Sequence, residues 1–408
     1  MASNCRFCST PLKHTFVDLG LSPVSNAFPS AADLDKEEPF YPLHAFVCPE
    51  CFLVQLEEFE SPDQIFSDYV YFSSYSDSWL AHAKTFANAA TERFGLGGDA
   101  RVVEVASNDG YLLQYFKQNG VPVLGIEPAG NVADVAIEAG IDTISEFFGV
   151  SLAEQLRKDN KLGNLVVGNN VLAHVPDIND FVGGLKIALA DDGVLCMEFP
   201  HLLKLIKQTQ FDTIYHEHFS YLSLLTVQRM FAHHGLIVFD VDELPTHGGS
   251  LRVYAQHPGG SQPHSDAVDR LLSTERTAKL DSLDGYVNFA DKVLKVKTDL
   301  LAFLREAQAD GKTVVGYGAP AKGNTLLNYC GIGTDLIEYT VDRSPHKQDL
   351  FLPGTHLPVH APEHIAKTKP DYVLILPWNL TDEVAGQMAH IREWGGKFVV
   401  PIPELRVF

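Results

Sequence analysis

Short apolar strands alternate with helical segments from residue 101 onward, and this alternation limits the possible folds more than any other feature of the chain. The expected strands of the first block read "RVVEVA", "PVLGIEP", "NLVVGNN", "GVLCMEFP", "LIVFDVDEL" and "LRVYAQ". Such a pattern predicts a doubly wound α/β domain. Since no long helix separates the last two strands, we expect them to form an antiparallel hairpin at one edge of the sheet.

A second α/β pattern begins at "KTVVGYGAPAKGNTLL" and continues through "IEYTVDR" and "DYVLILPW" to "FVVPIPEL". Residues 264–310, between the two blocks, have an apolar spacing of about 3.6 and are expected to form connecting helices. Another helix is expected in "SYSDSWLAHAKTFANAATERFGL". Because 408 residues exceed what one hydrophobic core holds, we expect three domains, at residues 1–70, 71–260 and 261–408.

Two C-x-x-C pairs lie near the amino terminus, Cys5 with Cys8 and Cys48 with Cys51. Two thiolates two residues apart can bind one ion from a tight turn, and two such turns complete a tetrahedral shell for zinc. We expect a structural zinc ion, because four protein ligands leave no open position. A disulfide pair and a redox C-x-x-C are the alternatives. The insert between the pairs is expected to be rich in loops.

The formal net charge of −21 argues against a nucleic-acid partner, because phosphate binding begins with a basic surface. A small anionic ligand in a local cationic pocket stays compatible with this charge. Apolar runs fall short of the ~18 residues of a membrane span, and "MASNCRFCST" lacks the build of a signal peptide. We expect a cytoplasmic protein with no membrane partner, a monomer or a weak homodimer, with Cys196 and Cys330 buried.

A cofactor site is expected where the first strands of the first block end. Glu104 and Glu127 close two of these strands, and Glu127 lies where a carboxylate can bind both hydroxyls of a ribose. The intervening turn has one glycine rather than G-x-G-x-x-G, and its acids would repel a pyrophosphate. S-adenosylmethionine is therefore favoured over NAD, the alternative being a domain that binds no cofactor. The expected cofactor-binding residues are Glu104, Asn108, Asp109, Gly110, Glu127, Pro128, Asn169, Asn170 and His174.

The segment "TIYHEHFSYLS", residues 213–223, follows the strand "GVLCMEFP" and is dense in groups that transfer protons. A metal site, a merely polar loop and an acid/base centre are the three readings. The spacing of His216 and His218 lacks the i, i+4 pair of H-E-x-x-H, which argues against a metal. On an extended loop the two rings share a face, and either can act as a general base near neutral pH. His247 is a second-choice base.

Several motifs together resemble the nucleotide-deoxysugar C-methyltransferases. They are "EVASNDG", "EFPH" followed by "YHEHFSYLS", "HGGSLRVY", "GYGAPAKGNTLLNY" and the two cysteine pairs, and they span nearly the whole chain in order. The resemblance implies an α/β protein with a zinc-binding amino-terminal module, a central class I methyltransferase domain and a carboxyl-terminal Rossmann-like domain. The sequence departs from the family pattern at Ala106, where a glycine is usual.

The resemblance also implies a reaction, the transfer of a methyl group to C-3 of a nucleotide-linked 4-keto sugar. Its catalytic residues fall on Tyr215, Glu217 and His218, and only the resemblance ranks His218 above His216. His218 would remove the C-3 proton, Tyr215 would donate to the enolate oxygen, and Glu217 would hold the imidazole or a sugar hydroxyl. A preorganised donor at such an oxygen is worth ~3–4 kcal/mol.

A second nucleotide-like site is expected at residues 312–348, where a glycine-containing turn and several cations form a local cationic pocket. The resemblance implies that this domain holds the nucleotide diphosphate of the sugar substrate. Tyr71 and Tyr75 could cover the sugar or form an aromatic domain seam. An NAD(P)-dependent oxidoreductase and a non-catalytic nucleotide-binding module remain alternatives. The expected substrate-binding residues are Tyr75, His216, Tyr221, His247, Gly318, Lys322, Asn324, Arg343 and His346.

Overall fold

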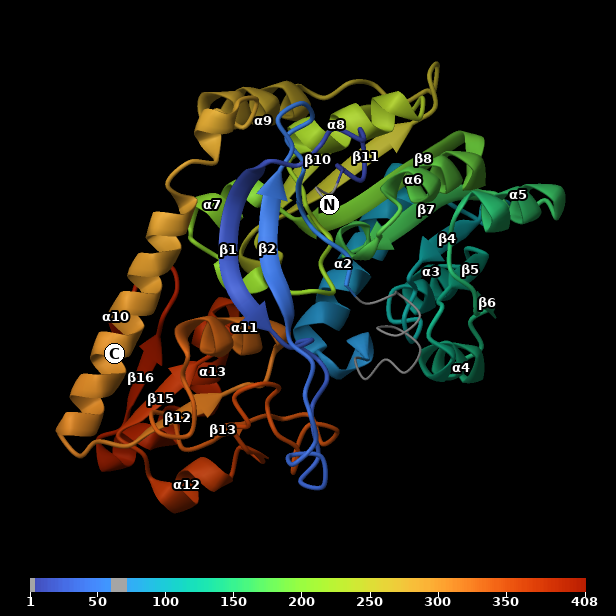
Figure 1. Ribbon diagram of the computed structural model, residues 1–408. Coiled ribbons are helices and arrows are strands. Elements are labelled where there is room, and N and C mark those ends of the chain that lie inside the picture. Colours follow the sequence, from blue (N-terminus) through green and yellow to red (C-terminus); the bar gives the residue numbers. More distant parts are fainter. Residues whose placement is uncertain (1–3, 60–71) are drawn as a thin grey trace.

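The computed structural model describes residues 4–59 and 72–408 and shows an α/β protein built on three sheets (Figure 1). The amino-terminal strands, drawn in blue, lie between the central sheet and the carboxyl-terminal domain. In the part of the chain that the structure describes, no helix is long and apolar enough to cross a membrane. The three domain ranges expected from the sequence stay predictions.

The amino-terminal module contains a sheet with the order β1-β2-β3-β9. Its strands are β1 (His14–Ser22), β2 (Tyr41–Val47), β3 (Val54–Leu56) and β9 (Ser220–Tyr221). The insert between the cysteine pairs is therefore less rich in loops than expected, because β1 and β2 pair antiparallel within it. The fourth strand, β9, comes from the middle of the chain and pairs antiparallel with β3.

The central sheet has the order β10-β11-β8-β7-β4-β5-β6. All six strands expected from the sequence are present, and the antiparallel pair β10–β11 is confirmed at the edge. Strand β6 has two half-buried residues and no apolar run, so the sequence did not indicate it. The strands are β4 (Val102–Val105), β5 (Val123–Ile126), β6 (Thr143–Ile144), β7 (Gly163–Asn169), β8 (Leu189–Pro200), β10 (Ile237–Leu244) and β11 (Ser250–Gln256).

Helix α2 (Asp77–Arg93) leads into the central domain and confirms the helix expected there. Ser76 caps it, because its side chain accepts a hydrogen bond from the Trp79 amide. Its apolar face, with Ala83, Phe86 and Ala90 at helical spacing, is buried against the sheet. The other helices here are α3 (Leu113–Gln118), α4 (Gly130–Glu138), α5 (Val150–Lys158), α6 (Ile178–Ala188), α7 (Leu202–Lys207) and α8 (Leu224–His233).

The carboxyl-terminal domain has a sheet with the order β14-β13-β12-β15-β16-β17, parallel except for the last pair. The connecting segment is helical as expected, and long helix α10 runs along one side of the molecule (Figure 1). The strands are β12 (Val314–Tyr317), β13 (Thr340–Val341), β14 (Val359–His360), β15 (Tyr372–Ile375), β16 (Lys397–Val400) and β17 (Arg406–Val407). The helices are α9 (Asp266–Thr277), α10 (Phe289–Ala309), α11 (Ala321–Cys330), α12 (His364–Thr368) and α13 (Thr381–Gln387).

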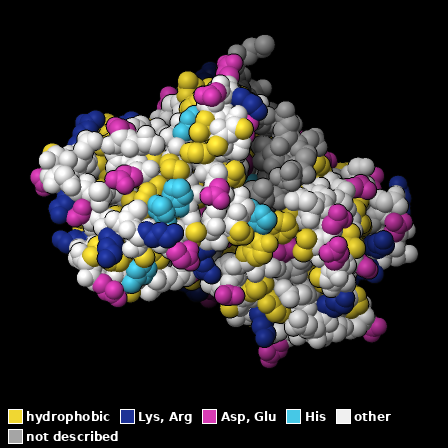
Figure 2. Space-filling view, turned by 90° about the horizontal axis from the view of Figure 1, so that it is seen from below, with side chains coloured by type: hydrophobic (Ala, Val, Ile, Leu, Met, Phe, Trp, Pro, Cys, Tyr) yellow, Lys and Arg dark blue, Asp and Glu magenta, His cyan; other side chains and the backbone are white. Residues whose placement is uncertain are grey.

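The acidic chain does not present one continuous charged face in the view of Figure 2. Acidic and basic side chains are interspersed there among apolar and neutral ones. Cys196 and Cys330 are buried core residues as expected, and burial raises the pKa of each thiol to about 12.

Candidate functional site

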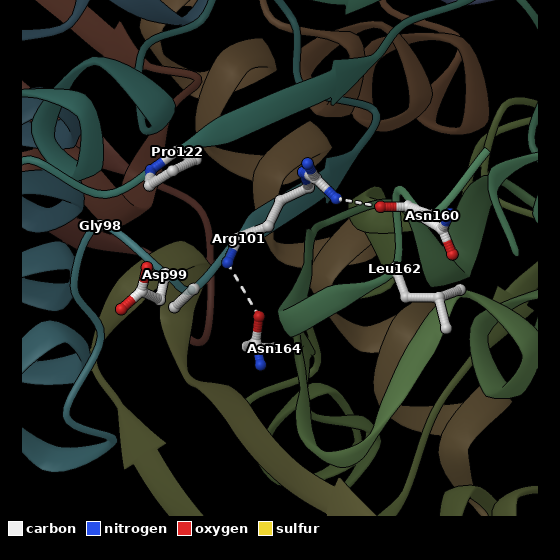
Figure 3. A pocket seen from close by; sticks show the side chains of 8 residues that line it. Gly98, Asp99, Arg101, Pro122, Asn160, Leu162 and Asn164 are labelled. Atoms are coloured by element: carbon white, nitrogen blue, oxygen red, sulfur yellow. Dashed lines mark hydrogen bonds between the residues drawn. The ribbon is translucent and has the colours of Figure 1, made fainter.

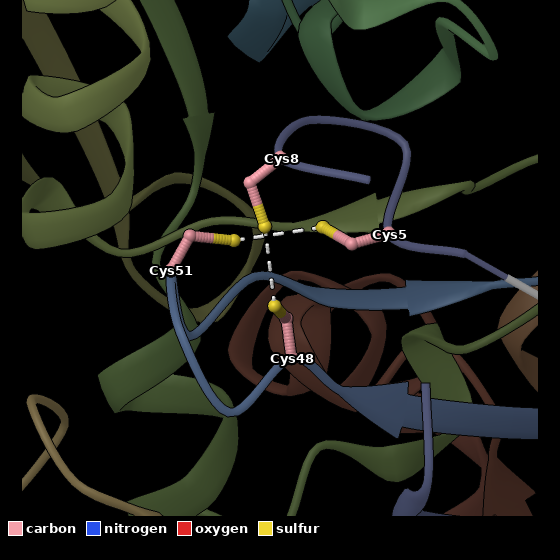
Figure 4. A group of neighbouring side chains, drawn as sticks. All are labelled: Cys5, Cys8, Cys48 and Cys51. Carbon is pink, nitrogen blue, oxygen red and sulfur yellow. Dashed lines mark hydrogen bonds between the residues drawn. The ribbon is translucent and has the colours of Figure 1, made fainter. Parts of the chain in front are cut away.

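Four cysteine sulfurs converge at one end of the amino-terminal module (Figure 4). The Sγ atoms of Cys5 and Cys51 are 3.5 Å apart, those of Cys8 and Cys48 are 3.4 Å apart, and all four lie within 4.8 Å of one another. A tetrahedron with zinc–sulfur bonds of about 2.3 Å has edges of about 3.8 Å, whereas a disulfide needs about 2.05 Å. The sulfurs therefore fit a zinc ion and do not fit disulfide bonds.

Gln55 supports this zinc site from β3, because its amide Nε2 donates to the sulfur of Cys5 at 3.2 Å. Within residues 4–59 and 72–408, the cysteines form the one group of three or more side chains with metal-ligand geometry. Since all four zinc ligands come from the protein, the ion is structural.

The turn after β4 passes through three residues with left-handed backbone, Ala106 (φ 57°), Asn108 (φ 50°) and Gly110 (φ 79°). Ala106 thus keeps the backbone path of the glycine usual at this position, at a cost of roughly 1–2 kcal/mol. A side chain at Gly110 would meet Ile141 at 3.0 Å, so this turn needs a glycine there. The left-handed residues let the turn fold closely over the carboxyl end of β4.

Glu127, at the end of β5, is held in place by this turn. Its Oε2 accepts from the Asn108 amide at 2.9 Å, and its Oε1 accepts from the Ala129 amide at 3.0 Å. Burial raises the pKa of Glu127, while these two amides lower it. Since each carboxylate oxygen accepts more than one hydrogen bond, both remain able to bind ribose hydroxyls.

Glu104 is fully buried beneath the turn, and burial raises its pKa well above the usual range, with Asp109 and Glu127 adding to the effect. The Tyr111 hydroxyl is the neighbouring donor that lowers the Glu104 pKa, although neither Glu104 oxygen reaches strict hydrogen-bond geometry among the described residues; the same holds for Asp109 Oδ1 and Asn169 Oδ1. Buried acceptors of this kind are costly unless a ligand or water pairs with them. The turn therefore fits a cationic ligand with hydroxyl and amino donors, as S-adenosylmethionine has.

The carboxyl end of β7 brings the other expected cofactor residues to the same edge of the sheet. Asn169 Nδ2 donates to the Tyr111 hydroxyl at 3.1 Å, and Asn170 Nδ2 lies 3.3 Å from His247 Nε2. Trp79 stacks on His247, with 5.3 Å between ring centroids, and also on Tyr111 at 6.0 Å. The sequence analysis missed Trp79 because an aromatic residue in an amphipathic helix carries no functional signal by itself.

His174 continues this edge toward the Tyr215–His218 segment. Its Nδ1 donates to the Glu217 carbonyl oxygen at 2.6 Å, because a carbonyl can only accept. Its ring packs edge-on against His218, with 4.6 Å between centroids. Burial lowers the pKa of His174 to about 4, so its ring is neutral.

Tyr215–His218 forms a turn, closed by the His218 amide, which donates to the Tyr215 carbonyl at 2.9 Å. His218 Nδ1 donates to the Thr213 carbonyl at 2.9 Å, which fixes the tautomer. Nε2 is then the acceptor of the neutral ring and takes a hydrogen bond from the Tyr215 hydroxyl at 2.8 Å. Burial, together with His174, His247 and Lys322, holds the pKa of His218 well below its usual range.

His216 points elsewhere, so the expectation that both histidines share a face is wrong. The backbone turns at this point instead of running extended. His216 Nε2 donates to the Pro42 carbonyl at 3.2 Å, and the ring packs edge-on against Tyr41 and Phe59 of the amino-terminal module. Among the expected substrate residues, Tyr221 is buried beside His218, with 6.4 Å between ring centroids.

The Glu217 side chain is buried, and burial raises its pKa. Its Oε1 accepts from Asn26 Nδ2 at 3.0 Å, so the partner of this carboxylate is an amide of the amino-terminal module. The sequence analysis missed Asn26, which lies 191 residues away in a loop and carries no recognisable motif.

The carboxyl-terminal domain reaches the same place through the first turn of α11. Lys322 Nζ donates to Asn379 Oδ1 at 2.7 Å and lies 4.8 Å from the centre of the Trp378 ring. Trp378 Nε1 in turn donates to the buried Asp212 at 2.7 Å. Burial is the main cause of the low pKa of both His218 and His247, and the charge of Lys322 contributes to it.

The other expected residues of the carboxyl-terminal domain are spread over a wider area. Asn324 is buried and its Nδ2 donates to the Ser25 carbonyl at 2.5 Å. Arg343 is exposed and lies 3.8 Å from Glu383. His346 lies beside Tyr75, with 6.3 Å between ring centroids.

Gly318 has a left-handed backbone (φ 91°), and a side chain there would meet Pro377 at 2.5 Å. The exposed Tyr75 follows Ser73 and Ser74, whose amides donate to Asn108 and Asp109 of the cofactor turn. Tyr71 lies outside the described residues.

A cavity of about 370 Å³ lies away from this site (Figure 3). Arg101, Pro122 and Leu162 line it, and each comes just before a strand of the central sheet. This depression is thus at the amino ends of the strands. Ligands of doubly wound sheets bind at the carboxyl ends, so we do not place the cofactor in it.

Three family models match the chain. They are described as "Putative zinc binding domain" (residues 5–66), "Methyltransferase domain" (79–241) and "C-methyltransferase C-terminal domain" (245–403). The C-methyltransferase NovU of Streptomyces niveus is 38% identical over 403 residues, which cover 99% of this chain and 96% of NovU.

Solved structures match the chain only in part. The magnesium protoporphyrin IX methyltransferase of Synechocystis PCC 6803 gives a TM-score of 0.35 at 15% identity and covers 48% of this chain and 91% of its own. The PH0226 protein of Pyrococcus horikoshii OT3 gives 0.37 at 12% identity, covering 49% and 99%. These scores are low, and the full-length match to NovU carries the assignment. The chain therefore belongs to the C-methyltransferase family, as an S-adenosylmethionine-dependent enzyme that carries a structural zinc ion.

Proposed function

We propose that the protein methylates the carbon next to the ketone, C-3, of a nucleotide-linked 4-keto-deoxyhexose, with His218 as the general base. The observation that carries this proposal is the state of the His218 ring. Its Nδ1 proton is committed to the Thr213 carbonyl, so Nε2 carries the basic lone pair, which accepts a hydrogen bond from the Tyr215 hydroxyl. The ring lies next to residues at the carboxyl ends of β7 and β8, where a cofactor of this fold binds.

When bound, S-adenosylmethionine supplies an electrophilic methyl group on a sulfonium, so the methyl group needs no further activation by a metal. We assign Glu127 to the ribose hydroxyls, because two backbone amides fix its carboxylate. Glu104 and Asp109 supply carboxyl oxygens that can accept hydrogen bonds from the amino group at the cationic end of the cofactor. Asn169, Asn170 and His174 lie along the same strand end.

Proton transfer from the sugar begins at His218 Nε2, which takes the C-3 hydrogen acidified by the neighbouring ketone. The C–H electron pair moves to the ketone oxygen and gives an enolate, whose carbon is then the nucleophile. Tyr215 donates to His218 Nε2 in the structure, and we assign its hydroxyl as the donor to that oxygen once Nε2 has taken the proton. The ammonium of Lys322 adds positive charge on the same side.

The nucleotide diphosphate is assigned to the carboxyl-terminal domain. Gly318 lets the chain turn closely after β12, and Arg343 supplies a cation and His346 an imidazole on the loop after β13. His346 lies beside Tyr75. Tyr75 directly follows Ser73 and Ser74, whose amides donate to the cofactor turn. A sugar held between these loops would lie close to Lys322 and His218.

A thermal-shift panel with S-adenosylhomocysteine, NADPH, dTDP, UDP, GDP and CDP, alone and in pairs, tests this proposal. A ligand at ~100 times its dissociation constant adds ~2.7 kcal/mol to the unfolding free energy. Independent shifts from S-adenosylhomocysteine and one nucleotide are expected, followed by formation of a C-3-methylated sugar seen by NMR with ¹³C-labelled methyl donor. A nucleotide sugar that binds but is never methylated at carbon would contradict the proposal, as would a shift from NADPH alone.

A further inference from the structure

The amino-terminal module contacts the proposed catalytic segment along its length, although the two are far apart in the sequence. Strand β9 begins two residues after His218 and pairs with β3, with Val54 opposite Tyr221. The Leu56 amide donates to the Phe219 carbonyl at 3.0 Å, and His216 donates to the module at Pro42. The backbone of residues 219–221 and the ring of His216 are thus held by the module that carries the zinc site.

One contact from this module reaches a proposed catalytic side chain. Asn26 Nδ2 donates to Glu217 Oε1 at 3.0 Å, and Glu217 is 2% exposed. Within the described part of the chain, the second oxygen of this carboxylate, Oε2, meets no hydrogen-bond partner. Backbone amides of Glu217 itself, Asn26 and Ser25 also lower the pKa of this carboxyl, and Oε2 keeps the capacity to accept a further hydrogen bond.

The loop that carries Asn26 is itself fixed from the opposite side. Asn324, at the first turn of α11, donates to the Ser25 carbonyl at 2.5 Å. The next residue, Thr325, donates its hydroxyl to the carbonyl of Ile214 at 2.9 Å. Ile214 directly precedes Tyr215 in the sequence. Two adjacent residues of one helix therefore hold both the Asn26 loop and the catalytic segment, which fixes their relative position.

We infer that Asn26 is a positioning residue, which orients the Glu217 carboxylate so that Oε2 accepts a hydrogen bond from a hydroxyl or amino group of the sugar. The inference rests on the proposed function, because it assumes a sugar at this site. Asn26 does not touch the reacting atoms. Its amide directs the Glu217 carboxylate and opposes the rise in pKa that burial causes, since a donor to the charged form favours that form.

The experiment compares Asn26→Ala with the isosteric Asn26→Asp in the full-length, zinc-loaded enzyme. We expect Asn26→Ala to lower kcat about tenfold, with the affinity for S-adenosylhomocysteine changed less than about twofold. The acid limb of the pH profile of kcat/KM should move to higher pH, because Glu217 loses one of the donors that lower its pKa, while the backbone amides remain. Asn26→Asp should move it further, because a second carboxylate then faces Glu217.

Asn179→Ala is the matched control. Asn179 also joins two domains, since its Nδ2 donates to the Phe7 carbonyl at 2.9 Å, but it does not contact the catalytic segment. This variant should keep the wild-type pH profile even if its melting temperature falls. Zinc content, measured for each variant, shows that the module is folded.

Three results would overturn the inference. Turnover of Asn26→Ala at the wild-type rate would do so, as would an acid limb that stays in place in both Asn26 variants. A loss of kcat that merely follows the loss of stability, as in Asn179→Ala, would overturn it as well. Failure of the proposed function is a different outcome, because the wild-type enzyme itself would then not methylate any 4-keto nucleotide sugar.

Discussion

Replacing His218 with Asn isolates one nitrogen of the proposed base. The Asn side chain places its amide where His218 Nδ1 lies, so the hydrogen bond to the Thr213 carbonyl at 2.9 Å can be kept. What disappears is Nε2, the acceptor of the Tyr215 hydroxyl at 2.8 Å. The perturbation therefore removes the basic lone pair while preserving the anchor of the turn.

The expected loss follows from the role of that lone pair. General-base catalysis is worth about 10²–10⁴-fold in rate, which corresponds to about 3–5 kcal/mol of activation free energy. Depriving the Tyr215 hydroxyl of this acceptor should cost a further ~1–3 kcal/mol of unfolding free energy. The affinity for S-adenosylhomocysteine should stay within about threefold, because His218 contributes little to binding the cofactor in the ground state.

Two rates measured separately make the test decisive. NMR follows the exchange of the C-3 hydrogen with D₂O in the presence of S-adenosylhomocysteine, and chromatography follows methyl transfer. Both should fall together in His218→Asn. The control is His216→Asn, whose ring faces Pro42 and should lose less than about tenfold. Exchange at the wild-type rate in His218→Asn, or equal losses in the two variants, would refute the assignment.

Other perturbations probe the charges and the metal. Lys322→Gln should lower kcat roughly 10²-fold with unchanged S-adenosylhomocysteine affinity in calorimetry, if its ammonium stabilises the enolate. Burial raises the pKa of Asp212 from 3.8 to about 7. The folded protein therefore keeps a proton that the unfolded chain releases, and about 4 kcal/mol of unfolding free energy is lost as the pH rises between these values. Asp212→Asn should flatten this decline in urea titrations at pH 4 to 7. Cys48→Ser should abolish zinc binding, seen by elemental analysis, and lower the melting temperature.

Local patterns were sufficient to predict the elements of the fold and the zinc ligands. The strands of the central sheet are apolar runs bounded by turns, and the C-x-x-C spacing is a property of a few adjacent residues. Ala106 shows a limit of prediction from local sequence. A glycine is usual at this position of the family, and the alanine nevertheless adopts the left-handed backbone that a glycine would adopt.

The arrangement of the site depends on contacts that no local pattern contains. Whether His216 or His218 faces the cofactor edge depends on a turn whose direction is fixed by Thr213, Pro42 and the pairing of β9 with β3. Asn26 reaches Glu217 from 191 residues away. Lys322, expected from the sequence to bind the substrate, contributes to the low pKa of His218, and its helix α11 contacts the catalytic segment through Thr325.

The pairing of β3 with β9 has a consequence for the order in which the chain folds during synthesis. The cysteine pairs are complete once residue 51 has left the ribosome, so zinc can bind early. The outer edge of β3, however, stays without its neighbour until Ser220 and Tyr221 emerge. An unpaired strand edge is prone to pair with other chains. The nascent protein thus carries an open edge throughout synthesis of most of the central domain, and the segment that closes it is the one proposed to perform catalysis.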